Sequence, residues 1–140
     1  MTHLHLVAVA AMIVLLSGVT LAQGPVDPGP EGVLPIGRWA QKRGQLSTRN
    51  QAVTFVEPCV GNGFLPSVVP VDSDGRFDVE GTFRFSTPVP EAPYFPVRYV
   101  GQLRGTHMAL AVISLDPEHP FVRAYQLRKG RKASFRGCPD

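Results

Sequence analysis

The sequence predicts an all-β domain: an antiparallel meander of seven or eight short strands that forms a small barrel, with a β-sandwich as the alternative. Residues 75–85 give the clearest evidence. Phe77, Val79, Phe83 and Phe85 share one parity, and charged side chains share the other. Such alternation is typical of a strand with one buried and one solvated face. Further short segments follow at hairpin-length spacing, and none shows a convincing helix pattern.

Residues 1–22 are predicted to be a secretory signal peptide. They lack Asp, Glu, Lys and Arg, and the apolar run Leu6–Leu16 is too short to span a bilayer. Thr20 and Ala22 supply the small side chains of a signal-peptidase site. A retained membrane anchor is the alternative, and the lack of an early basic residue departs from the usual signal. We therefore expect a secreted or periplasmic protein with no stable membrane span after cleavage.

The remaining chain is expected to have two parts. Residues 23–35 are rich in Pro and Gly, so they are predicted to be a flexible lead-in rather than a strand or helix. Residues 36–140 are predicted to form a single β domain, because they are long enough for one two-layer core.

Each strand is predicted from β-branched, aromatic or alternating residues, and each boundary from turn-forming residues. The predicted strands are 36–40, 52–56, 75–85, 97–104, 106–115, 121–127 and 132–136. Residues 41–50 are predicted to be a turn and an edge strand, and residues 64–71 an edge strand or an extended cover because two prolines interrupt them. The predicted turns and loops are 61–63, 72–75, 86–96, 104–106, 116–120 and 128–131.

Residues 106–115 are apolar on both parities, which is typical of a strand covered on both faces. A helix is the alternative there, because Ala, Leu and Met are good helix formers. The preceding Gly105 and the lack of capping residues favour the strand.

Cys59 and Cys138 remain after signal cleavage, and an oxidising compartment favours a disulfide between them. A metal site would need more ligands nearby, and a redox pair would have closer spacing. Closing so long a loop would stabilise the fold by about 4–5 kcal/mol in the chain-entropy model.

Gly37-Arg38-Trp39 is similar to the Gly-x-Trp motif of lipocalin-like and avidin-like barrels, in which the Trp closes one end; secreted bacterial protease-inhibitor barrels share it. Residues 37–138 also resemble a group of uncharacterised small secreted bacterial proteins. The shared order is Gly-x-Trp, a Cys with a Gly turn, residues 75–81, residues 98–112 and the closing Cys138. This resemblance implies an extracytoplasmic β domain with paired cysteines and carries no active site.

The expected function is non-enzymatic binding of a small apolar ligand or a protein partner. The side chains that would line a ligand cavity, or else fill a packed core, include Trp39, Phe77, Phe83, Tyr99 and Met108. His107 and His119 are not accompanied by a Gly-x-Ser-x-Gly elbow, so no catalytic residue is predicted. Asp72-x-Asp74-Gly75 is similar to the start of a calcium loop, but its Gly comes too early, so we predict a turn, no metal and no cofactor.

The net charge is +3, and the basic excess lies after Val97. Four cations surround a predicted turn there and are a possible contact for anions: Arg128, Lys129, Arg131 and Lys132. The alternative function is therefore a structural or surface-associated envelope protein that contacts anionic polymer. A charged turn that protects a sheet edge is the simpler interpretation. No nucleic-acid partner is expected, because interleaved aromatic residues are missing.

Overall fold

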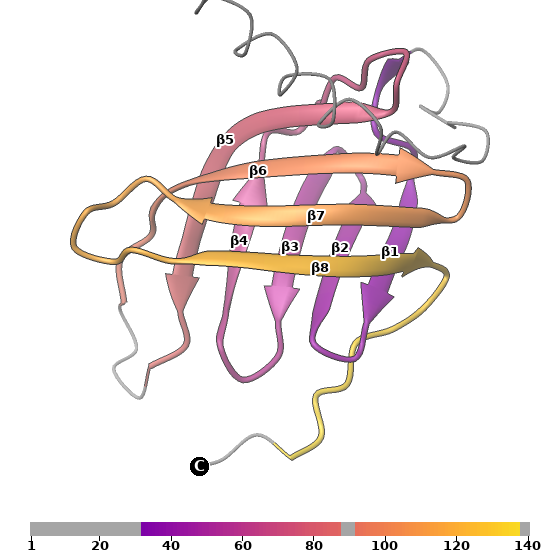
Figure 1. Ribbon diagram of the computed structural model, residues 1–140. Helices are drawn as coiled ribbons and strands as arrows, with labels where there is room; N and C mark the ends of the chain where they lie inside the picture. The colour runs from indigo at the N-terminus through magenta and orange to yellow at the C-terminus, as the bar shows by residue number, and fades with distance from the viewer. Residues whose placement is uncertain (1–31, 88–91, 138–140) are drawn as a thin grey trace, which may run out of the picture.

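The computed structural model describes residues 32–87 and 92–137, which form a closed barrel of eight antiparallel strands in sequence order (Figure 1). The strands are β1 Gly37–Gln41, β2 Gly44–Arg49, β3 Ala52–Glu57, β4 Gly61–Leu65, β5 Arg76–Phe85, β6 Phe95–Arg104, β7 His107–Ser114 and β8 Val122–Lys129. Each strand pairs with the next, and β8 pairs with β1. The prediction of an all-β barrel is confirmed, and the strand predicted at residues 106–115 is β7.

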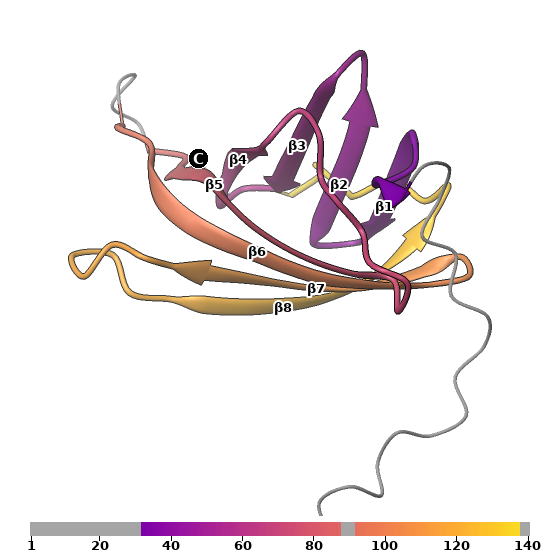
Figure 2. The ribbon, with the colours of Figure 1, turned by 90° about the horizontal axis from the view of Figure 1, so that it is seen from above.

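The barrel is made of two groups of strands that cross each other. In Figure 1, β1–β4 run steeply and β6–β8 run almost at right angles to them, and Figure 2 shows the two groups as separate layers joined through β5. Residues 76–83 of β5 pair with β6, and residues 82–85 pair with β4. Gly81 lies where β5 bends: a Cβ on it would come within 2.2 Å of the Phe64 carbonyl oxygen, so only glycine permits this approach.

The barrel interior holds the inward side chains of all eight strands. Its largest fully buried members are Trp39, Tyr99, Phe55, Phe83, Leu46, Leu103, Met108, Leu110 and Leu127. Strand alternation explains this set, because every second residue of each strand points inward. Burial of these side chains supplies most of the driving force for folding, at about 1.5–3 kcal/mol for each.

Three predicted boundaries are wrong. Residues 61–63 lie in β4 rather than in a turn, and the turn before it holds Cys59 at a φ of 69°. Residues 44–49 form a strand paired on both sides. Residues 132–136 are not a strand: β8 continues to Lys129, and the chain then turns at Gly130, whose φ is 80°.

The segment after β8 crosses the outside of the barrel at the β1–β2 turn. The Ala133 amide donates to Gln45 Oε1 at 3.2 Å, and the Ser134 amide donates to the Lys42 carbonyl at 3.1 Å. The predicted signal peptide and most of the predicted lead-in lie outside the described residues. Within the described ranges there is no helix long and apolar enough to cross a membrane.

Candidate functional site

The five side chains that the sequence offered as a ligand cavity all lie in the barrel core. Trp39, Phe77, Phe83, Tyr99 and Met108 each expose 3% of their surface or less. Phe83 and Tyr99 both pack against the Phe55 ring, with centroids 6.4 and 6.0 Å from it. These residues therefore belong to the hydrophobic core cluster of the barrel.

Aromatic rings in the interior lie over glycines of other strands. A Cβ on Gly101 would come within 2.1 Å of the Phe77 ring, and one on Gly63 within 2.2 Å of the Tyr99 hydroxyl. The Tyr99 hydroxyl donates to the Thr82 carbonyl at 2.8 Å, which satisfies its only donor. Since rings occupy this space, binding surfaces are to be sought on the outer faces.

One polar cluster lies inside the barrel and joins β3 to β8. Glu57 exposes 6% of its surface and accepts hydrogen bonds from the Tyr125 hydroxyl and, at 2.9 Å, from Arg123 Nη1. Glu57 was not among the predicted site residues, and it follows directly after the strand predicted at residues 52–56. The signal was present, because Val53, Phe55 and Glu57 share one parity.

Two buried tyrosines make the stability of the fold sensitive to alkali. Burial raises the pKa of Tyr99 above its ordinary 10.0, and burial together with the hydrogen bond to Glu57 raises the pKa of Tyr125. The folded protein keeps both phenol protons where the unfolded chain loses them. The stabilisation is therefore complete below pH 10 and falls at higher pH by up to about 1.4 kcal/mol per pH unit for each tyrosine.

We therefore expect the midpoint of urea unfolding to fall steadily above about pH 10. The Tyr99→Phe variant should lose about half of this pH dependence, although it is less stable at neutral pH. An unchanged slope in this variant would contradict the assignment. The measurement is the free energy of urea unfolding at several pH values, with circular dichroism as the signal of unfolding.

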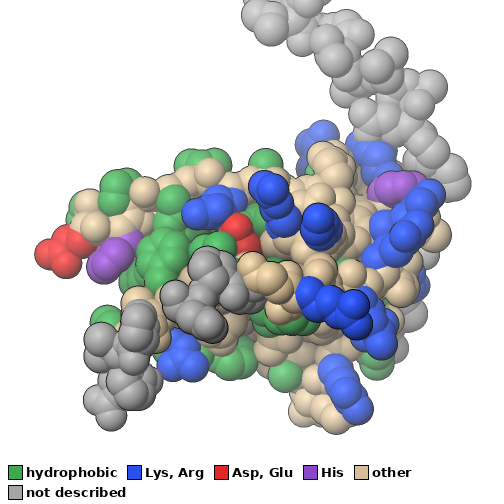
Figure 3. Space-filling view, turned by 90° about the horizontal axis from the view of Figure 1, so that it is seen from below, with side chains coloured by type: hydrophobic (Ala, Val, Ile, Leu, Met, Phe, Trp, Pro, Cys, Tyr) green, Lys and Arg blue, Asp and Glu red, His purple; other side chains and the backbone are tan. Residues whose placement is uncertain are grey.

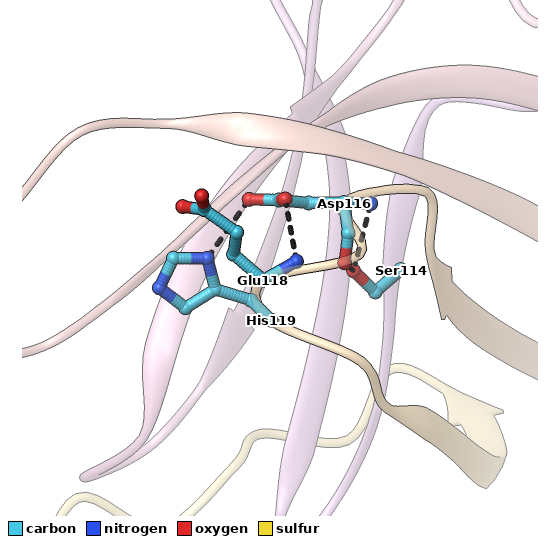
Figure 4. Close-up of polar contacts among 4 residues, drawn as sticks. All are labelled: Ser114, Asp116, Glu118 and His119. Atoms are coloured by element: carbon cyan, nitrogen blue, oxygen red, sulfur yellow. Dashed lines mark hydrogen bonds and ion pairs between the residues drawn. The ribbon is translucent and has the colours of Figure 1, made fainter.

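The β7–β8 turn holds the residues that most resemble a catalytic group, Ser114, Asp116 and His119 (Figure 4). His119 Nδ1 lies 2.8 Å from Asp116 Oδ2, and this contact, with the Glu118 amide, lowers the pKa of Asp116. Ser114 Oγ bonds the amide and the carbonyl of Asp116 at 3.2 Å instead of the imidazole. The His119 ring stacks on Phe95 at 4.9 Å. These contacts shape a turn and do not make a nucleophile–base pair.

The carboxylate of Asp72 and that of the nearby Asp78 each have a protein partner. Asp72 Oδ1 accepts the amides of Asp74 and Arg76 at 2.8 and 2.9 Å, which forms the predicted turn. Asp78 lies on the outer face of β5 and is paired with Arg98, whose hydrogen bond lowers the pKa of Asp78. Within residues 32–87 and 92–137, no three His, Cys, Asp or Glu side chains are placed to share a metal ion.

A hollow of about 700 Å³ lies on the outer face of the β5–β8 sheet. Its floor contains Val100, Ala109, Ala111 and Ala124, and one wall is residues 70–72 of the β4–β5 connection. Figure 2 shows this connection reaching the end of the sheet where β5 begins. None of these residues was predicted to form a site, although the apolar residues on both parities of 106–115 are the signal that indicates one.

The four predicted anion contacts lie on both sides of the turn at Gly130, where the Arg131 amide donates to the Arg128 carbonyl at 3.3 Å. Arg128 and Lys129 end β8, with Lys129 Nζ 5.7 Å from the centre of the Trp39 ring, and Arg131 and Lys132 follow the turn at Gly130. The Arg131 carbonyl accepts a hydrogen bond from Arg38 Nε at 2.9 Å, which brings β1 into the same basic region.

No family model, curated protein or solved structure matches the chain. The function is therefore argued from the surfaces alone.

Proposed function

We propose that this protein is an exported, non-enzymatic binding domain that holds an apolar segment of a protein partner on the outer face of its β5–β8 sheet. The composition of that face carries the proposal. Outward positions that would be polar on a solvated barrel are instead Val100, Ala109, Ala111, Ile113 and Ala124.

Strand β7 is apolar on both faces but is covered on one. Met108, Leu110 and Val112 point into the core and are buried. On the outer side Ala109 is exposed, and Val122, which pairs with Ile113, exposes 71% of its surface. Exposed apolar surface of this kind marks interaction sites, and apolar side chains of a partner would supply the second cover.

The shape of the hollow favours a protein segment over a small ligand. Small-molecule sites usually enclose most of the ligand surface, whereas this hollow is open to solvent above a sheet floor. The barrel interior, where a small apolar ligand was expected, is filled with side chains. Arg76, Gln102 and Gln126 border the floor and offer hydrogen bonds to the backbone of a bound segment.

Export and the disulfide remain part of the proposal. Export is supported by the leader-like sequence of residues 1–22. Cys59 lies in the β3–β4 turn, and the segment after β8 passes the β1–β2 turn at the same end of the meander (Figure 1). Residue 138, which lies outside the described residues, follows that segment, and this supports pairing of Cys59 with Cys138.

Site-specific photo-crosslinking tests the proposal. We expect a benzoylphenylalanine at position 111 to give one discrete adduct with another protein in cells that express the full chain. The same probe at Glu80, an exposed outward position of β5 outside the hollow, should give none. Ala124→Arg should reduce the adduct at position 111 at least tenfold, because it places a charge on the apolar floor.

Absence of an adduct at position 111, or equal adducts from positions 111 and 80, would refute the partner site. An adduct formed only with a second copy of the chain would also refute it, in favour of self-association. Far-ultraviolet circular dichroism of each variant checks that the barrel remains folded.

A further inference from the structure

The charges of this protein are separated by sector. Among the described residues, β1, β2, the turn between them, β8 and residues 130–137 carry Lys and Arg but no Asp or Glu. The described acidic residues are Glu57, inside the barrel, and those of β5, its preceding turn and the β7–β8 turn. In Figure 3 most visible Lys and Arg side chains lie in the middle and to the right, and Asp and Glu side chains are visible only at the far left and near the middle. One side of the barrel therefore attracts anions.

A row of outward side chains leads from this basic sector across the β1–β4 sheet. Arg38 is opposite Ser47, Ser47 is opposite Thr54, and Thr54 is opposite Phe64. Because neighbouring strands lie about 4.8 Å apart, the row is about 14 Å long. Arg38, Ser47 and Thr54 lie in a hollow of about 750 Å³ that Arg49 also lines, and its lining contains no Asp or Glu.

The two ends of the row differ in chemistry. Arg38 Nε donates to the Arg131 carbonyl, which holds the guanidinium in place and leaves its Nη groups for a ligand. At the other end, Phe64 and Tyr94 expose 45% and 39% of their surfaces, with ring centroids 5.7 Å apart. The Arg84 guanidinium lies 4.6 Å from the Tyr94 ring centre, and Asn62 Nδ2 lies 3.3 Å from the Tyr94 hydroxyl. These contacts hold the Tyr94 ring in place, and the rings of Phe64 and Tyr94 together form an exposed aromatic platform.

We propose that this row binds an acidic polysaccharide. The guanidinium groups of Arg38 and Arg49 pair with the acid groups of the polymer. The hydroxyls of Ser47 and Thr54 exchange hydrogen bonds with sugar hydroxyls, and the C–H face of a sugar ring packs on the platform of Phe64 and Tyr94. Only a ligand with charged, hydroxylated and weakly apolar surfaces in succession matches all three parts of the row.

Other polyanions match the row less well. A single-stranded nucleic acid would need cations and aromatic rings interleaved along its path, whereas the middle of the row is uncharged and both rings lie at one end. A membrane surface would be met by a flat or protruding patch of cations, whereas Arg38 lies in a hollow.

Isothermal titration calorimetry with polygalacturonate and heparin tests the proposal on the mature full-length protein. We expect binding to at least one of the two and none to neutral dextran. The double variant Arg38→Gln/Arg49→Gln should weaken binding at least tenfold. The matched control Arg76→Gln/Arg104→Gln removes the same charge from β5 and β6 and should change affinity less than twofold. Phe64→Ala should weaken binding about fivefold without changing its salt dependence.

Three results would overturn the proposal. They are no binding to either polysaccharide, equal losses in the two double variants, and tighter Arg38-dependent binding to single-stranded DNA or to vesicles with anionic lipid. If the double variant Arg38→Gln/Arg49→Gln does not fold, the single variant Arg49→Gln replaces it, because Arg49 lies at the exposed end of β2. Because the row lies on β1–β4 and the hollow of the proposed partner site lies on β5–β8, with no lining residue in common, failure here leaves the proposed protein partner untouched.

Discussion

Gly63→Ala is expected to lower the free energy of unfolding by about 3 kcal/mol or more, at the upper end of the cost of overpacking a core. A Cβ at this position would lie 2.1 Å from the Thr82 carbonyl oxygen and 2.2 Å from the Tyr99 hydroxyl. The carbonyl belongs to the backbone of β5, so the strands must separate to admit the methyl group. The measurement is urea unfolding of the variant and of the parent protein.

Gly101→Ala is the informative comparison, because there only a side chain is in the way. A Cβ on Gly101 would meet the Phe77 ring at 2.1 Å, and its three nearest atoms all belong to that ring. The second substitution Phe77→Leu, which shortens the side chain, should therefore recover part of the lost stability in Gly101→Ala. Tyr99→Phe should recover little in Gly63→Ala, since the carbonyl remains. Equal recovery in both pairs would contradict the proposed packing.

These glycines explain why the barrel was predictable from the sequence but β4 was not. Alternation of apolar and polar residues is a local property, and it located β5, β6 and β7 closely. Gly61 and Gly63 indicate a turn when read locally. They lie in β4 because Phe83 and Tyr99 need the space above them, and that requirement arises from strands distant in sequence. A local pattern contains no information on such a contact.

The candidate sites also differ in how far a local sequence pattern could predict them. The five predicted cavity residues are all inward, as alternation requires, but whether inward side chains enclose a cavity or fill it depends on their packing across the barrel. The row from Arg38 to Phe64 depends on the register of four strands, which the sequence does not specify. Only the apolar outer face of β7 was visible in the sequence, because both parities of one strand are local.

Arg123→Met is expected to cost about 3 kcal/mol at neutral pH, because it leaves the Glu57 carboxylate in the barrel with a neutral partner alone. Removing one member of a buried ion pair costs about 3–5 kcal/mol. The lower end of this range applies here, because the Arg123 side chain is 43% exposed and water weakens its attraction to the Glu57 carboxylate. Methionine keeps most of the arginine's length and its packing, so the change isolates the charge.

The double variant Glu57→Gln/Arg123→Met separates the charge from the shape of the cluster. A neutral amide no longer needs the guanidinium, and its oxygen still accepts from the Tyr125 hydroxyl. The double variant should therefore be more stable than Arg123→Met alone, although Glu57→Gln alone is destabilising, and the coupling between the two sites should exceed about 1 kcal/mol. Additive losses in the four urea titrations would mean that the ion pair contributes nothing across the barrel. A large coupling would show that this ion pair helps to hold β3 against β8, two strands that do not pair with each other and are also joined by the packing of Phe55 on Tyr125.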